Sequence, residues 1–116
     1  MDFYLQEDVP EREAVLSVTR DLGVDLILGG PHYRYGIADL YYHNSVFLIR
    51  QGKLAGRYDK IRLLPFAEEA EFGGRLSQEQ LIYEPGRHLH TLRTGDIRIG
   101  AFVCFEAMSP DLVRDL

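Results

Sequence analysis

The chain has 116 residues, of which 46% are hydrophobic and 27% are charged, a composition typical of one globular domain. Its formal net charge of −5 offers no basic field for nucleic acid, so we expect no nucleic-acid partner. A single cysteine excludes an internal disulfide and a multi-cysteine metal site. No apolar run approaches the ~20 residues of a membrane-spanning helix, and the residues after Met1 do not resemble a signal peptide.

The first predicted elements are a helix and a buried strand. Pro10 to Leu22 carries apolar residues at helical spacing, with Asp8 as a candidate N-cap and Gly23 as the end of the helix. The apolar run from Val24 to Leu28 predicts a strand buried on both faces, and residues 29–31, Gly-Gly-Pro, predict a tight turn that closes it. A helix followed by such a strand indicates the α/β class.

A β-hairpin is predicted next, after a loop over residues 31–40. Tyr41 to Arg50 is rich in aromatic and β-branched residues, and Leu54 to Tyr58 returns as its partner across the turn at residues 51–53. From Asp59 to about Glu69 the pattern is irregular, and it predicts an ordered loop that leads into a short helix.

A second hairpin and a helix complete the predicted elements. The hairpin joins Leu89–Arg93 to Ile97–Val103, and the latter strand is strongly apolar and continues directly to Cys104. Ser109 or Asp111 then begins a helix.

Cys104 is the first candidate functional residue. At the C-terminal end of a buried strand, a thiol would be held by the sheet and would project into the crevice above it. The N–H groups of a following helix start would favour a thiolate and a developing oxyanion. The alternative is a buried, small apolar side chain without a chemical role.

Lys60 and three glutamates are the other candidates. Lys60 precedes the apolar stretch Leu63–Phe66, which would anchor its loop against the core, and an ammonium held there could stabilise a thiolate and an oxyanion. Glu68 or Glu69 could orient the lysine, and Glu106, close to the cysteine in sequence, could contribute to the same pocket. The alternatives are a solvated lysine and carboxylates at the surface or at helix starts.

The four histidines, at positions 32, 43, 88 and 90, give no recognisable metal pattern. No Cys, Asp or Glu stands at a familiar ligand spacing near them, so we expect no metal site. A Cys–His pair remains open, although no local signature supports it.

Taken in chain order, several motifs resemble the nitrilase (carbon–nitrogen hydrolase) superfamily. They are Tyr42–Ser45 at the head of a strand, Gly56–Lys60 after a hairpin, Leu63–Glu68, and Val103–Glu106 after the second hairpin. That superfamily carries a Glu-Lys-Cys triad on an α/β sandwich. The resemblance therefore implies a nitrilase-like α-β-β-α sandwich, present here in part. The Leu-Pro-Phe-Ala-Glu stretch and the Cys-Phe-Glu triplet look most like apolipoprotein N-acyltransferases, whereas amidases and nitrilases more often have Asp after the cysteine.

The resemblance implies roles for five residues. Cys104 matches the nucleophile, Lys60 the catalytic lysine, and Glu68 a second glutamate near the active site. Phe105 would lend its backbone N–H to the oxyanion hole, and Glu106 matches the glutamate that follows the nucleophile in the acyltransferases.

One part of the family pattern is not found in these residues. The general-base glutamate of the family lies in a Trp-Pro-Glu-like motif whose position falls before Met1, and neither Glu7 nor Glu11 is assigned to that role. We therefore expect residues 1–116 to form a single partial nitrilase-like domain, truncated at both ends.

The reaction that the resemblance implies is an acyl transfer without a cofactor. A fatty acyl chain would pass from a phospholipid donor, through a cysteine thioester, to the N-terminal amine of a diacylglyceryl lipoprotein. The resemblance implies a location at the bacterial inner membrane, on its periplasmic side, with membrane segments outside this chain. Two alternatives stay open: a soluble amidase or nitrilase of the same superfamily, and a non-catalytic or inactive α/β module.

Overall fold

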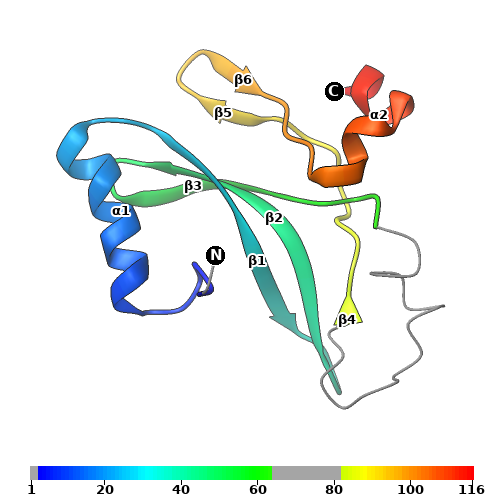
Figure 1. Cartoon of the computed structure of the whole chain (residues 1–116), viewed down its shortest axis with the longest axis horizontal. Helices are drawn as coiled ribbons and strands as arrows, with labels where there is room; N and C mark the ends of the chain where they lie inside the picture. The colour runs from blue at the N-terminus through cyan, green and yellow to red at the C-terminus, as the bar shows by residue number, and fades with distance from the viewer. Residues whose placement is uncertain (1–2, 64–81) are drawn as a thin grey trace.

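The computed structural model describes residues 3–63 and 82–116 and confirms the α/β class (Figure 1). One antiparallel sheet has the order β1-β2-β3, with a short parallel strand β4 beside β2, and β5 and β6 form a separate two-stranded sheet. The elements are α1 (Pro10–Leu22), β1 (Leu26–Tyr35), β2 (Leu40–Arg50), β3 (Lys53–Asp59), β4 (Ile82–Tyr83), β5 (Leu92–Thr94), β6 (Ile97–Ile99), the 3₁₀ helix η1 (Cys104–Met108) and α2 (Pro110–Asp115).

Helix α1 has the predicted bounds, but its N-cap differs from the prediction. Val9, rather than Asp8, is the N-cap, and no side chain caps the helix. Pro10 at the first helical position has no N–H to satisfy, which lowers the need for a polar cap. Gly23 ends the helix with a φ of 63°, a left-handed conformation that glycine adopts without steric cost.

Strand β1 corrects two predictions. The Gly-Gly-Pro sequence at residues 29–31 lies within the strand, not in a turn, and the predicted loop is largely strand because β1 pairs with β2 as far as Tyr35. Pro31 is tolerated because β1 is an edge strand of the described sheet, where a missing N–H breaks no ladder on the open side. The strand is not buried on both faces: Leu26 and Leu28 pack against the core, but Ile27 is 42% exposed, as befits an antiparallel edge.

The hairpin of β2 and β3 agrees with the prediction. Gln51 and Gly52 both have positive φ, 50° and 73°, which is the backbone pattern of a type I′ turn. Ten of the 11 residues of β2 pair with β1 on one side, while β3 occupies the other. Strand β2 is therefore the central strand of the described sheet.

Two hydrophobic clusters lie on opposite faces of this sheet, because side chains alternate along β2. On the α1 face, Phe47 and Ile49 pack with Leu5 and Leu16. On the other face, Leu48, Tyr58 and Leu92 form a second cluster, which residues of the C-terminal segment, among them Ala101 and Val103, join. Each fully buried side chain of this size contributes ~1.5–3 kcal/mol. The second cluster attaches the C-terminal segment to the sheet.

The C-terminal hairpin is confirmed, but it is shorter than predicted. Strand β6 ends at Ile99, and residues 100–103 cross to η1 without a strand ladder. Cys104 therefore begins a 3₁₀ helix after a short extended connection, rather than directly after a strand. Helix α2 begins after Ser109, one of the two predicted starts. Among the described helices, none has the length and apolar character to cross a bilayer.

Candidate functional site

Cys104 is exposed and lies at the edge of a cavity, so the alternative of a buried apolar cysteine is wrong. Its φ is 56°, a left-handed conformation that few non-glycine residues adopt. Strained backbone of this kind is common where a nucleophile is presented at the junction of an extended segment and a helix. The local conformation thus projects the thiol outward from the start of η1.

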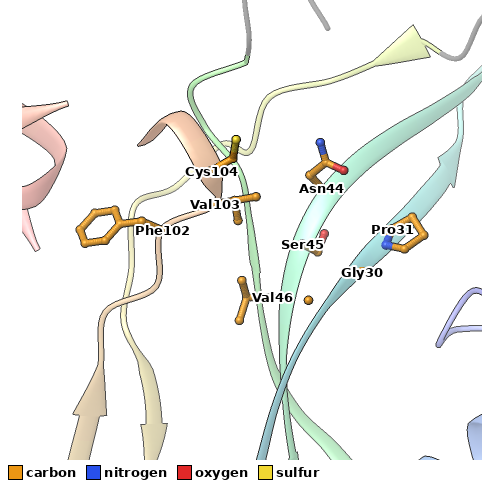
Figure 2. A pocket seen from close by; sticks show the side chains of 9 residues that line it. Gly30, Pro31, Asn44, Ser45, Val46, Phe102, Val103 and Cys104 are labelled. Atoms are coloured by element: carbon orange, nitrogen blue, oxygen red, sulfur yellow. The ribbon is translucent and has the colours of Figure 1, made fainter. Parts of the chain in front are cut away.

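The cavity beside Cys104 has a volume of about 350 Å³ (Figure 2). One side is formed by residues 102–104, and the facing side by the middle of β1 and β2. The Gly-Gly-Pro sequence of β1 lines this space, together with Asn44 and Ser45.

Lys60 is only 2% exposed, so the alternative of a solvated surface lysine is also wrong. Its backbone is fixed on both sides: its N–H donates to the carbonyl of Asn44 at 2.8 Å, and its carbonyl accepts from Gly86 at 2.8 Å. Asn44 itself lines the cavity beside Cys104. A buried ammonium is unfavourable unless it is paired or hydrogen-bonded, and Lys60 does have interacting partners.

Glu106 is completely buried and binds two separate loops. Its Oε1 accepts hydrogen bonds from the backbone N–H of Ile61 and, at 3.0 Å, of Arg62. Its Oε2 accepts from the N–H of Val103 at 3.0 Å, and the Tyr58 hydroxyl donates to the same carboxylate at 3.1 Å. These four hydrogen-bond donors compensate for the loss of solvation of the buried carboxylate.

This carboxylate brings two candidate segments together. The residues that follow Lys60 and the residue that precedes Cys104 are bound to the same side chain of Glu106. The sequence predicted that Glu106 contributes to the pocket; the structure places it beneath the loops, where it holds their backbones.

A polar network beside Lys60 was not predicted from the sequence. Ser45 donates to Asp59 at 2.6 Å, and the Arg57 guanidinium binds the same carboxylate at 3.0 Å. The register of the hairpin, in which Ser45 faces Asp59, would have indicated the first contact. This network fixes the end of β3 directly before the lysine.

The remaining candidates are placed as follows. Glu68 and Glu69 lie outside the described residues. Phe105 is the second residue of η1. Glu7 accepts a hydrogen bond from the Tyr33 hydroxyl at 2.9 Å, and Glu11 lies exposed in the first turn of α1. Within residues 3–63 and 82–116, no three His, Cys, Asp or Glu side chains form a group that could hold a metal ion.

We expect Glu106→Ala to destabilise the protein by about 3–5 kcal/mol, because three backbone N–H groups and a buried hydroxyl would lose their acceptor. Urea denaturation followed by circular dichroism measures this change. Glu106→Gln should cost less, because one oxygen can still accept from Ile61 and Arg62. Equal stability of Glu106→Ala and of the exposed-site control Glu11→Gln would contradict this account of Glu106.

Tyr58→Phe is expected to cost about 1.5–3 kcal/mol, the usual net value of a hydrogen bond to a charged group. Tyr58 is fully buried, and burial next to the Glu106 carboxylate raises the pKa of its hydroxyl, so the phenol stays protonated and donates. In the Glu106→Ala background the same substitution should cost much less, because the acceptor is gone. Additive costs in this double-mutant cycle would show that the two groups do not interact.

His32 should make stability depend on pH. Burial lowers its pKa from 6.5 to about 4, the Arg57 guanidinium and His43 add to this effect, and Asp59 opposes it. Between about pH 6.5 and 4 the unfolded chain therefore binds more protons than the folded chain, and stability falls as the pH falls through this window. Urea midpoints measured from pH 7 to 4.5 should fall less steeply in His32→Gln; an unchanged slope would exclude His32 as the cause.

Comparison with known proteins gives one family match and several similar relatives. Residues 2–116 match the Carbon-nitrogen hydrolase family. An apolipoprotein N-acyltransferase of Geobacter metallireducens is 34% identical over 97% of this chain, and one of Synechocystis is 33% identical over 96%. A deaminated glutathione amidase of Yersinia enterocolitica is 32% identical over 94% of the chain.

The chain spans only part of each of these relatives. It covers 23% of the Geobacter protein, 22% of the Synechocystis protein and 38% of the Yersinia amidase. The family match, by contrast, extends over almost all of the 116 residues, and it includes both Lys60 and Cys104. The chain belongs to the carbon–nitrogen hydrolase family.

Proposed function

We propose that this chain contributes the acyl-accepting cysteine of an apolipoprotein N-acyltransferase. The observation that carries the proposal is the exposed thiol of Cys104, which lies on a strained backbone beside a cavity. Asn44 lines the far side of this cavity, and its carbonyl accepts a hydrogen bond from the backbone N–H of the buried Lys60. The similarity to the apolipoprotein N-acyltransferases of Geobacter and Synechocystis supports acyl transfer as the reaction. The Cys-Phe-Glu triplet favours the same choice.

In the proposed first half-reaction, the sulfur of Cys104 attacks the ester carbonyl carbon of a phospholipid acyl chain. A C–S bond forms, and the carbonyl oxygen becomes an oxyanion that the Lys60 ammonium and the backbone N–H of Phe105 stabilise. Each such donor is worth ~3–4 kcal/mol. Collapse of the intermediate breaks the ester C–O bond, releases the lysophospholipid and leaves a thioester on Cys104.

In the second half-reaction, the free α-amine of a diacylglyceryl-cysteine attacks the thioester carbonyl. An amide bond forms, the C–S bond breaks, and Cys104 returns as a thiol. A thioester suits this step because amines attack it readily while a closed site limits hydrolysis. We assign Glu68 as a second glutamate near the reacting groups, and the proton acceptor for Cys104 as a glutamate outside these 116 residues.

Glu106 has a positioning role in this proposal. By holding the backbones of Ile61, Arg62 and Val103, it would keep Lys60 and the N–H of Phe105 aimed at one oxygen. Small displacements of such donors are costly to the rate, since their effect depends on geometry fixed before reaction.

We further propose that the chain is part of a longer nitrilase-like sandwich. The two sheets, with clusters on opposite faces of β2, suit such an arrangement, in which β5 and β6 begin the second sheet. The short coverage of the relatives supports a longer domain, and membrane attachment at the periplasmic side would come from segments outside this chain.

Acyl transfer is tested with the protein as its gene encodes it, including any flanking sequence. Membranes that contain it receive a phospholipid with a labelled acyl chain and a synthetic diacylglyceryl lipopeptide, and mass spectrometry follows the lipopeptide. Labelled N-acyl lipopeptide supports the proposal. Absence of this product, combined with release of ammonia from small amides, would instead support the amidase function that the Yersinia relative suggests.

A further inference from the structure

A second cavity of about 350 Å³ lies at a different place, lined by residues of β1, β2 and β3 and of the segment 84–90. Three arginines and three histidines contribute to its lining, together with two carboxylates. Cys104 does not line it. We call it the arginine–histidine cavity.

Of the three arginines that line this cavity, two form ion pairs with its carboxylates and one is available to bind a ligand. Arg34 forms an ion pair with Glu84, and Arg57 forms one with Asp59, so these four groups balance. The exposed guanidinium of Arg87 has no ion-pair partner within residues 3–63 and 82–116. Among the described lining residues the arginines therefore outnumber the carboxylates by one, which favours an anionic ligand.

His43 gives an independent indication of a ligand. The residue is 5% exposed and lines the cavity, and within the described part of the chain its Nδ1 has no hydrogen-bond partner. Buried polar nitrogens without a partner are rare, because their desolvation is not compensated. When Nδ1 carries the proton, it could donate a hydrogen bond to an oxygen of a bound anion.

We propose that the arginine–histidine cavity binds a phosphate group, with Arg87 and His43 Nδ1 as donors. Arg87 comes from the loop and His43 from the sheet, so the two donors approach from different elements. A tetrahedral phosphate, with oxygens in several directions, suits such donors better than a planar carboxylate. The phosphate could be free or part of a lipid headgroup. This inference is independent of the acyl-transfer function.

The test is a titration of the purified protein, as its gene encodes it, with inorganic phosphate at pH 7. The imidazole C–H proton resonances of His43 report the binding. We expect a saturable shift that sodium chloride at the same ionic strength does not produce. Arg87→Ala should weaken binding roughly tenfold, the usual effect of losing one charge-assisted hydrogen bond. Arg98→Ala is the matched control, since Arg98 is exposed on β6 and does not line the cavity.

Two results would overturn the proposal: no saturable change at His43, or equal weakening in the two arginine variants. Both replaced side chains are exposed, so the fold should persist, which circular dichroism verifies. A parallel titration with dimethyl phosphate separates the sources of the ligand. Tighter binding of this diester indicates a lipid headgroup, and tighter binding of inorganic phosphate indicates a free phosphate or monoester.

Discussion

Cys104→Ala is expected to abolish the covalent acylation of the protein and to lower the rate of N-acyl transfer on the order of 10⁴-fold or more, as removal of a nucleophile does in other covalent enzymes. The reason is that the sulfur is the only protein atom that bonds to the acyl carbon in the proposed mechanism. Intact-protein mass spectrometry after incubation with a phospholipid labelled in its acyl chain measures the adduct directly. The mass should increase by one acyl group in the wild type only.

The exposure of Cys104 makes this experiment clean. An exposed side chain contributes little to packing, so the alanine variant should keep its stability within about 0.5 kcal/mol. Met108, at the other end of η1, is also an exposed sulfur-containing residue, and Met108→Ala serves as the control. Labelled acyl chain still attached to Cys104→Ala would show that another residue is the nucleophile.

Local sequence patterns predicted the elements whose bounds depend on near neighbours. The bounds of α1 follow from helical spacing with Pro10 at its start and Gly23 at its end. The turn at Gln51 and Gly52 follows from residues that tolerate positive φ between two apolar runs. Both predictions are confirmed because the physical causes act within a few residues.

Strand β1 shows why other parts could not be predicted. A Gly-Gly-Pro sequence normally indicates a turn, yet residues 29–31 lie within a strand because β2 pairs alongside them. The pairing gains backbone hydrogen bonds that no local pattern reveals. The exposure of Ile27 likewise depends on which segments cover the sheet, which is a tertiary property.

The candidate site divides in the same way. Resemblance in sequence selected Lys60 and Cys104. The burial of Lys60 excludes a solvated surface lysine, and the exposure of Cys104 excludes a buried cysteine. The bonds of Glu106 to Ile61 and Arg62 span 45 and 44 residues and end on backbone N–H groups, which leave no mark in the sequence. The catalytic roles themselves, including that of Glu68, stay predictions.

The second large effect is expected for Lys60→Met, which should slow acylation of Cys104 by about 10²- to 10³-fold, the usual cost of removing one oxyanion donor. Methionine keeps most of the volume of the buried lysine but removes its charge. The chain has a second lysine, Lys53, which is exposed on β3 and supplies a matched control with the same change of charge.

The central claim is that the Lys60 ammonium and the Cys104 sulfur act on one acyl group in a shared pocket. The most direct measurement is the single-turnover rate at which p-nitrophenyl butyrate acylates Cys104 in the wild type, Lys60→Met and Lys53→Met, with folding verified by circular dichroism. The account predicts a large loss of rate in Lys60→Met and a wild-type rate in Lys53→Met. Equal rates in the two folded variants would contradict it.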